Sequence, residues 1–354
     1  MKNLYISLSL LVIGMSAMAQ NKDTKVADKL FSRYEYVSAA KEYLKLVDAK
    51  KADAYVYKQL ADANYNIFNI KEAINWYAKA TTVKQDAETY FRYAQMLKSN
   101  KNYEGAITQM KKFVELAPND SRSKAFNQNP NYVTAISSKE PNYAVKALDI
   151  NTDKSEFGAV LYGNELFFTS ARNTSGKNYG WDKEPFLDVY KSIKGDTGLF
   201  SQPTPVTSLN SKFHDGPISI TKDGNILYFS SDSFRENTFE KDKKNNSKLG
   251  RNNLYKAKKS GDSWIEIKPL PFNSKNYSLS NPSISRDGKT LYFSSNMPGS
   301  LGGVDVWKVA VKEDGTYGSP ENLGSKVNTE GNESFPFIAD DNVTLSLSSR
   351  RSKE

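Results

Sequence analysis

Hydrophobic residues follow two different periods along this 354-residue chain. Between residues 25 and 118 they recur at helical spacing and β-branched runs are few, which indicates amphipathic helices. From residue 142 onward short apolar runs are bounded by Asp-Gly, Asn and Ser, which is typical of strands joined by tight turns. The pattern predicts an α+β multidomain protein, helical at the N-terminus and all-β at the C-terminus.

One repeated stretch organises the all-β region. It reads Asp-Gly-Lys-Thr-Leu-Tyr-Phe-Ser-Ser at 287–295, and its copies lie at 223–231, 163–170 and, more weakly, 340–349. The aligned positions, 61, 64 and 54 residues apart, are Phe168, Phe229, Phe293 and Leu347. Each copy is predicted to be a turn and a buried strand, with one short strand before it and one after it. Four such strands form an antiparallel unit, and units repeated radially form a β-propeller.

The helical region repeats as well. Similar segments begin at Ala40, Ala73 and Ala106, which are 33 residues apart both times. Small residues at this spacing let paired helices approach closely, and the pattern resembles the tetratricopeptide repeat. Three repeats are enough for a stacked array to bury its apolar faces. An ordinary helical bundle is the alternative.

A family resemblance rests on these repeats. The pattern Pro-x-Ile-Ser-x-Asp-Gly-x-x-Leu-Tyr-Phe-Ser-Ser, followed by Gly302-Gly303-Val304-Asp305-Val306-Trp307, resembles the TolB-type, WD-like propeller repeat. With the helical repeats in front, the chain resembles the N-terminal part of a family of periplasmic, outer-membrane-associated proteins from bacteria that use type IX secretion and gliding. In that family a small β-domain and an OmpA-like peptidoglycan-binding domain follow. The resemblance implies a non-enzymatic scaffold that ties a secretion, gliding or envelope complex to the cell wall.

The predicted organisation has four parts. They are a signal peptide at 1–19, helical repeats at 22–118, a connector or capping helix at 119–141, and a propeller at 142–354. The fourth copy lacks a counterpart of the strand Asp305-Val306-Trp307, so we expect an incomplete propeller of three blades and part of a fourth. Peptidoglycan binding would require a further C-terminal domain, since no OmpA-like segment is recognisable.

The N-terminus predicts export. Lys2, the apolar run from Leu4 to Met15 and the small residues Ala17 and Ala19 form a secretory signal. We expect cleavage after Ala19 and a location in the periplasm, associated with the outer membrane. No later run approaches the ~20 apolar residues of a membrane span.

The sequence predicts no catalytic, cofactor-binding or metal-binding residues. It has no cysteine and one histidine, His214, which excludes disulfides, thiolate sites and multi-histidine metal sites. A hydrolase triad needs a base beside its nucleophile, but His214 precedes a predicted strand and is interpreted as a strand-entry residue. No Gly-x-Ser-x-Gly elbow or phosphate-binding glycine loop is present. The repeated aspartates Asp223, Asp287 and Asp340 are interpreted as turn formers.

Two surfaces are candidate partner sites. A tetratricopeptide array has a concave groove, and its family positions map onto Tyr55, Lys58, Asp62, Tyr65, Asn66, Phe91, Gln95 and Lys98. These side chains either meet a partner or are solvated or packed against the next domain. The second surface is the long blade loop 232–252, whose basic residues are Arg235, Lys241, Lys243, Lys244, Lys248 and Arg251. It either meets an acidic partner or anionic polymer or is a solvated loop. Another long loop, 172–185, carries Trp181.

The expected partners are other envelope proteins, in the outer membrane or the secretion machinery. Nucleic acid is not expected, although the net charge is +9, because the protein is exported and its basic residues lack interleaved aromatics. The alternative function is an exported binding module or accessory subunit for a glycan or peptide substrate.

Overall fold

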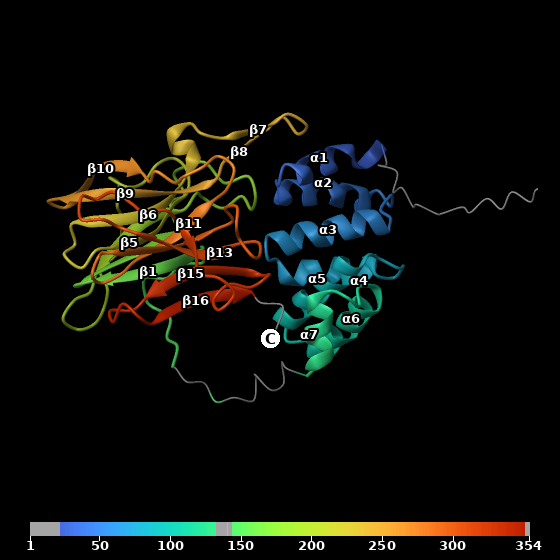
Figure 1. The fold of residues 1–354 in the computed structure, drawn as a ribbon. Coiled ribbons are helices and arrows are strands. Elements are labelled where there is room, and N and C mark those ends of the chain that lie inside the picture. The colour runs from blue at the N-terminus through green and yellow to red at the C-terminus, as the bar shows by residue number, and fades with distance from the viewer. Residues whose placement is uncertain (1–21, 132–139, 141–143, 351–354) are drawn as a thin grey trace, which may run out of the picture.

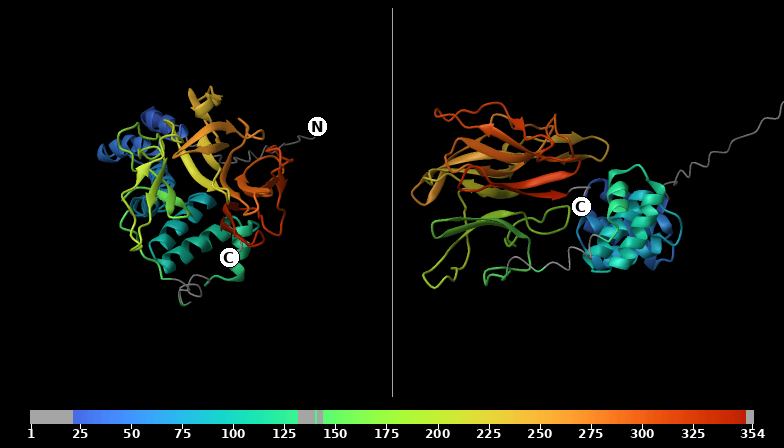
Figure 2. Two further views of the ribbon diagram at one scale, coloured as in Figure 1. Left: turned by 90° about the vertical axis from the view of Figure 1, so that its left-hand side faces the viewer. Right: turned by 60° about the horizontal axis from the view of Figure 1, so that its bottom comes forward.

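The structure is a computed structural model that describes residues 22–131, 140 and 144–350. Within them a helical domain and a β-rich domain lie side by side (Figure 1, Figure 2). This confirms the predicted fold class, a helical solenoid followed by an all-β domain. The predicted signal peptide, and residues 132–139 and 141 of the predicted connector, lie outside the described residues.

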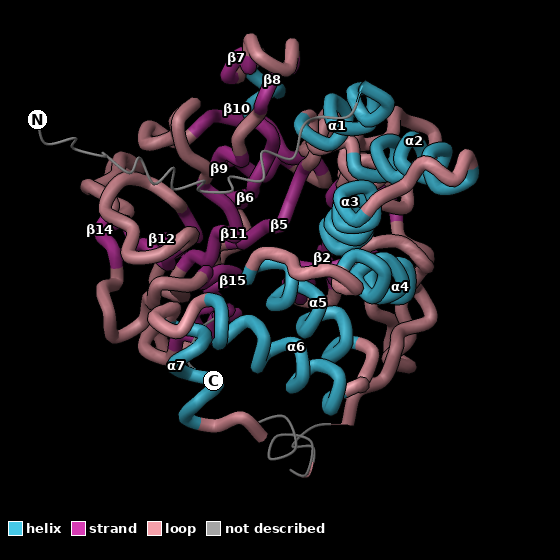
Figure 3. The backbone as a smooth tube through the Cα atoms, turned by 90° about the vertical axis from the view of Figure 1, so that its right-hand side faces the viewer, coloured by secondary structure: helices cyan, strands magenta, loops and turns pink. Residues whose placement is uncertain are grey.

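The helical domain is a stack of helix pairs (Figure 3). After the short 3-10 helix η1 (Lys22–Thr24), the helices are α1 (Lys25–Ser32), α2 (Tyr36–Asp48), α3 (Ala54–Asn66), α4 (Ile70–Ala80), α5 (Ala87–Ser99), α6 (Tyr103–Leu116) and α7 (Ser121–Gln128). The first six pack as the three predicted pairs. Helix α7 lies in the predicted connector segment and contacts α6.

Local sequence explains the helix starts and the close pairing. The side chains of Asp53 and Asp86 accept hydrogen bonds from backbone N–H groups three residues on, at 3.0 and 2.8 Å, which caps α3 and α5. The predicted alanines Ala40, Ala73 and Ala106 are all buried in the helical domain. A larger side chain at these positions would separate the paired helices.

Two buried aspartate–tyrosine pairs repeat in the helical core. Tyr43 donates its hydroxyl to Asp28 at 2.5 Å, and Tyr77 donates to Asp62 at 2.7 Å. In each pair the tyrosine lies fifteen positions after the aspartate. Both tyrosines are fully buried, and burial followed by the nearby carboxylate raises the pKa of Tyr77. These pairs join the two helices of each of the first two repeats.

The β-rich domain consists of antiparallel sheets that follow one another around an axis, as in a propeller. Their strands are β1 (Glu156–Tyr162), β2 (Glu165–Ser170), β3 (Asp188–Ile193) and β4 (Thr204–Pro205); β5 (Asp215–Ile220), β6 (Ile226–Asp232), β9 (Asn252–Ser260) and β10 (Ser263–Pro269); β11 (Leu279–Ile284), β12 (Thr290–Ser295), β13 (Asp305–Ala310) and β14 (Glu321–Asn322); and β15 (Asn332–Ile338) and β16 (Leu345–Arg350). The first three sheets have four strands and the last has two. A separate hairpin, β7 (Glu240–Asp242) and β8 (Ser247–Leu249), projects from the second blade (Figure 1).

The repeated stretch has the predicted structure in each complete blade. Its phenylalanine lies on the second strand and faces an aromatic partner on the third; the pairs are Phe168 with Tyr190, Phe229 with Tyr255, and Phe293 with Trp307. The turn aspartates Asp223 and Asp287 each accept a hydroxyl hydrogen bond at 2.6 Å from the residue two positions earlier. Gly224 and Gly288 follow them with φ of +72°, which only glycine adopts readily. The interpretation as turn formers is confirmed for Asp223 and Asp287. In the fourth copy Asp341, and not the predicted Asp340, accepts the turn hydrogen bonds, from the N–H groups of Val343 and Thr344.

Hydrophobic cores lie between consecutive blades. One contains Phe167 of the first blade with Leu227 and Phe229 of the second. The next contains Tyr228 of the second blade with Leu291 of the third. The first and fourth blades approach at Phe157 and Phe335, whose ring centroids are 5.9 Å apart. None of the sheets formed by the described residues closes on itself.

Candidate functional site

The junction between the two domains is built around a loop of the first blade, residues 171–187, which connects β2 to β3. A tight turn shapes its tip: Tyr179 N–H donates to the carbonyl of Glu184 at 2.7 Å, and Lys183 N–H donates to the carbonyl of Tyr179 at 3.0 Å. Trp181 lies within this turn. The loop therefore presents one large aromatic side chain toward the helices.

Trp181 is anchored in the helical domain. Its indole Nε1 donates a hydrogen bond to the backbone carbonyl of Asn66 at 2.9 Å. Its ring stacks on Tyr34 with centroids 6.0 Å apart and meets Tyr36 edge-on at 4.8 Å. Tyr34 occupies the turn between α1 and α2 with φ of +62°. The propeller thus contacts the first two helix pairs through a single side chain with both apolar and polar contacts.

His214 supports the base of this loop. Its Nδ1 accepts a hydrogen bond from Leu187 N–H at 3.0 Å. The imidazole lies 4.5 Å from the Tyr179 ring and 4.7 Å from the Phe186 ring. Burial lowers the pKa of His214 to about 4, so the ring is neutral near pH 7. The residue directly precedes β5, as its interpretation as a strand-entry residue predicts.

The second blade makes another contact with the helices. The hairpin β7–β8 extends toward α1 (Figure 1), where Ser32 Oγ donates to Asn245 Oδ1 at 2.9 Å. Asp242 fixes the hairpin turn by accepting from the backbone and side-chain nitrogens of Asn245, at 3.1 and 2.7 Å. Two excursions from consecutive blades therefore bridge the domains.

Three of the predicted groove residues share one charged network. The carboxylate of Asp62 accepts from Lys58 at 2.7 Å, from Tyr77 at 2.7 Å and from Arg92 at 3.2 Å. The Arg92 guanidinium also lies 5.2 Å from the ring centroid of Tyr65. Only 4% of the Asp62 side chain is exposed. These contacts fix the positions of the charged side chains on this face of α3 and α5.

The other predicted groove residues have separate surroundings. Tyr55 donates its hydroxyl to Asp28 at 2.8 Å, and Asn66 contacts Trp181 as described above. Phe91 packs against α6 and α7, with its ring 5.3 Å from that of Phe113 and 4.2 Å from the Arg122 guanidinium. The remaining two, on α5, are half-buried: Gln95 and Lys98. The binding of a partner by these eight residues stays a prediction.

The predicted basic loop contains the hairpin β7–β8 and the short helix η2 (Ser233–Glu236). Arg235 is turned inward and donates to the buried carboxylate of Asp215 at 2.9 Å. Arg251 pairs with Glu240 at 2.9 Å. The other basic residues are exposed: Lys241, Lys243, Lys244 and Lys248. The loop is thus an ordered element, and its arginines have structural partners.

The aspartate, glutamate and histidine side chains of the described residues take part in separate contacts and do not gather at one place. No three histidine, aspartate or glutamate side chains in residues 22–131, 140 and 144–350 come together as metal ligands. Within the same residues, none of the helices has both the length and the apolar character needed to cross a bilayer.

Sequence reasoning did not identify the role of Trp181. It noted the long loop, and a signal was present, because a large aromatic residue in a polar blade loop is a candidate anchor for another surface. Nothing in the spacing of the loop connects it to Asn66, which lies 115 positions earlier.

A family model described as tetratricopeptide repeat matches residues 87–120, which contain α5 and α6. No curated protein matches the chain. The helical domain therefore contains a tetratricopeptide repeat, a module that suggests interaction between proteins.

Several solved structures are similar to parts of the chain. TolB from Acinetobacter baumannii is 16% identical over 57% of this chain and 39% of its own, with a TM-score of 0.36. The first tetratricopeptide domain of Spaghetti (RPAP3), bound to an HSP90 peptide, is 20% identical over 32% of this chain and 90% of its own, with a TM-score of 0.28. The C-terminal part of a tetratricopeptide repeat-containing protein from Cytophaga hutchinsonii is 22% identical over 32% of this chain and 48% of its own, with a TM-score of 0.27.

Proposed function

We propose that this protein is a non-enzymatic scaffold of the bacterial envelope that binds other envelope proteins through its helical domain. The main support for this proposal is that the helical domain already binds a loop of the propeller. It does so through the ring of Trp181, which stacks on Tyr34, and through the carbonyl of Asn66, which accepts a hydrogen bond from Trp181. Recognition of an aromatic side chain plus a backbone group is how folded surfaces hold a protein segment. Gln95, a half-buried predicted groove residue on α5, is the position at which we expect a partner to make contact.

The surroundings of the acid and base groups support a non-enzymatic role. Asp28 and Asp62 accept hydrogen bonds inside the helical core, and Asp215 pairs with Arg235 in the propeller. His214 accepts a backbone hydrogen bond in an aromatic setting. These groups stabilise the fold, and each has its partner before any substrate arrives.

The proposed location is the periplasm, at the outer membrane, in a type IX secretion, gliding or general envelope complex. The signal-like N-terminus and the order of the repeats support it. Envelope fractionation with an antibody against the helical domain tests this location. Recovery of the protein in the cytoplasmic fraction would contradict it, and the size of the band would show whether further domains follow.

The interaction itself is tested by site-specific photocrosslinking in the native host. A photoreactive residue at Gln95, on α5, is compared with one at the exposed Lys41, on α2. We expect discrete adducts with an outer-membrane or secretion protein from position 95 and none from position 41. Adducts that are absent from position 95, or identical at both positions, would contradict a scaffold that acts through this face.

One observation favours a second candidate, an exported binding module for a glycan or peptide. The second blade has an aromatic-lined cavity of about 540 Å³, a size within the range of about 300–1,000 Å³ that ligand sites have. Thermal stabilisation by a small ligand would favour this function over the scaffold.

A further inference from the structure

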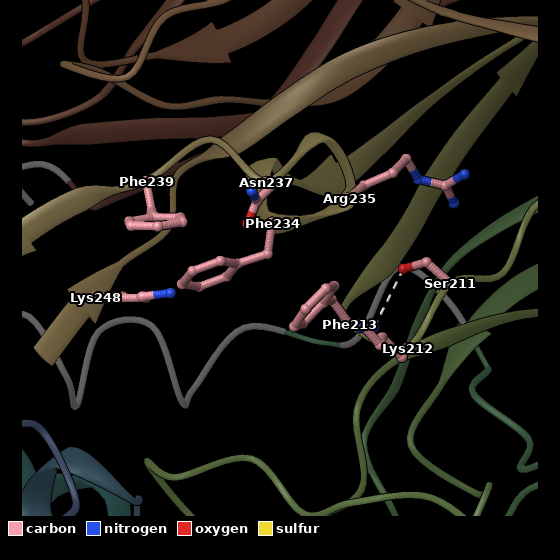
Figure 4. Close-up of a pocket in the computed structure, with 8 residues that line it drawn as sticks. All are labelled: Ser211, Lys212, Phe213, Phe234, Arg235, Asn237, Phe239 and Lys248. Atoms are coloured by element: carbon pink, nitrogen blue, oxygen red, sulfur yellow. Dashed lines mark hydrogen bonds between the residues drawn. The ribbon is translucent and has the colours of Figure 1, made fainter.

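The cavity lies on the second blade, between the segment that precedes β5 and the excursion that contains η2 and the hairpin β7–β8 (Figure 4). Three phenylalanine rings form a row along it. Phe213 stacks on Phe234 with centroids 5.2 Å apart, and Phe234 lies 5.6 Å from Phe239. All three side chains are half-buried. The row therefore lines the cavity with an apolar aromatic surface.

Both walls of the cavity are held by one buried carboxylate. Asp215, which has no exposed surface, accepts from Ser211 N–H at 2.5 Å on one wall and from Arg235 at 2.9 Å on the other. Phe213 N–H in turn donates to Ser211 Oγ at 3.1 Å. The rings are thus positioned before a ligand binds, which lowers the entropic cost of binding.

The helix that carries Phe234 is fixed in the same way. Asp232 accepts from Phe234 N–H at 3.0 Å. The chain passes so close at Gly250 that an added Cβ would lie 2.4 Å from an Asp232 oxygen and 2.9 Å from the Phe234 ring. Any side chain at Gly250 would displace the middle ring of the row.

Lysine ammonium groups lie at the two ends of the row. Lys212 Nζ is 5.5 Å from the Phe213 ring centroid, and Lys248 Nζ is 4.2 Å from the Phe239 ring centroid. Both lysines are exposed, and no carboxylate of the described residues lies within ion-pair distance of either one. The cavity therefore combines an apolar centre with two cationic ends.

We propose that this cavity binds a segment of a partner protein in which an aromatic side chain is flanked by aspartate or glutamate. The aromatic side chain packs on the phenylalanine row, and carboxylates on either side of it meet Lys212 and Lys248. An extended segment advances about 3.4 Å per residue, so acidic residues two or three positions away reach both ends. The inference rests on the proposed function only in that the ligand is a protein segment.

The test is fluorescence anisotropy with the purified protein and a fluorescein-labelled peptide, Gly-Asp-Glu-Asp-Trp-Asp-Glu-Asp-Gly. We expect at least tenfold weaker binding when alanine replaces the tryptophan, and also when the protein carries Phe234→Ala. Circular dichroism checks that Phe234→Ala is folded. If it is not, Phe239→Ala, at the end of the row, should show the same loss of affinity for the peptide. Replacing Lys212 and Lys248 together by glutamine should weaken binding at least fivefold.

The matched control removes the same charge outside the cavity. Lys243→Gln with Lys244→Gln, in the hairpin turn, should change the affinity less than twofold. Equal weakening by the two lysine pairs would show general charge attraction and would overturn the proposal, as would no binding of the tryptophan peptide at about 1 mM, the weak limit of specific recognition. Failure here leaves photocrosslinking from Gln95 unaffected, so it is distinguishable from failure of the scaffold function.

Discussion

Trp181 donates its indole N–H to the carbonyl of Asn66, the last residue of α3, at 2.9 Å. The last four carbonyls of a helix have no donor within the helix. A side chain from the propeller therefore caps a helix of the other domain. Because the same ring stacks on Tyr34, one residue joins the first two helix pairs to the first blade.

We expect Trp181→Ala to separate the domains without unfolding either one. The variant loses the stacking, the edge contact and the hydrogen bond, about 2 kcal/mol of docking free energy for a half-buried aromatic side chain. Small-angle scattering should show a larger radius of gyration, and amide exchange should increase at the C-terminal turn of α3. Unchanged scattering would show that the β7–β8 hairpin holds the domains by itself.

Trp181→Phe is the matched control for that experiment. Phenylalanine retains an aromatic ring against Tyr34 and Tyr36 but cannot donate to Asn66. We expect an intermediate loss of about 1 kcal/mol, the net contribution of one hydrogen bond. A loss as large as that of the alanine variant would mean that the hydrogen bond, and not the ring, determines docking.

Asp62→Asn should destabilise the helical domain more than Asp28→Asn. Asp62 accepts from Lys58 and Arg92, and these cations cannot accept from an introduced amide. The hydroxyls around Asp28 can rotate to accept one. We expect about 3 kcal/mol for Asp62→Asn and about 1 kcal/mol for Asp28→Asn, measured by urea unfolding. Equal losses would contradict the charged nature of the Asp62 network.

The repeats made most of the fold predictable from the sequence. The alanines 33 residues apart and the Leu-Tyr-Phe stretches reveal the spacing of hydrophobic residues within each element. This spacing determines which face of a helix or strand is buried. Ala73 and Phe293 are both buried where the pattern placed them. The β7–β8 hairpin was not predicted from the sequence, because its strands are short and polar and have few neighbours.

The junction was not predictable in the same way. The contact of Trp181 with Asn66 depends on how two separately folded domains dock, and no local pattern encodes that distance. The basic loop could not be resolved from the sequence for the same reason. Arg235 and Lys248 are both basic residues of this loop, but of the two only Arg235 lies beside a buried carboxylate. Pairing of this kind depends on tertiary contacts.

The contribution of His214 to the stability of the propeller should fall as the pH is lowered from about 6.5 toward 4. His214 has an ordinary pKa of 6.5 when unfolded, and burial lowers it to about 4 in the fold. In this interval the unfolded state binds a proton that the folded state does not, so acid favours unfolding. The full effect is at most about 3 kcal/mol, measured by urea unfolding across this pH range.

His214→Asn separates this effect from other titrations. Asparagine retains an acceptor for Leu187 N–H but does not titrate. Asp232 acts in the opposite sense, because burial raises its pKa to about 6 and its folded form loses stability as the pH rises through that value. The difference in stability between wild type and His214→Asn removes the Asp232 contribution. A difference that does not change between pH 4 and 6.5 would contradict a buried neutral His214.

Substitutions of Asp215 and Arg235 should be strongly coupled in their effects on stability. The third blade has apolar side chains at the corresponding places, so the fold should tolerate the loss of both charged groups better than the loss of one. Asp215 pairs in register with Ser231, and Leu279 pairs with Ser295 at the same place one blade later. Arg235 lies 5.3 Å from the ring centroid of Phe229, and Met297 lies in the apolar cluster of the third blade. The fold therefore accepts either a charged or an apolar pair here.

A double-mutant cycle measures this coupling. Arg235→Met alone leaves Asp215 buried without its cation and should cost about 3 kcal/mol. Adding Asp215→Leu removes the stranded carboxylate, although Ser211 N–H then loses an acceptor. We expect the double variant to be at least 1 kcal/mol more stable than the sum of the single losses predicts. Additive losses in urea unfolding would show that Arg235 acts by packing alone, independently of Asp215.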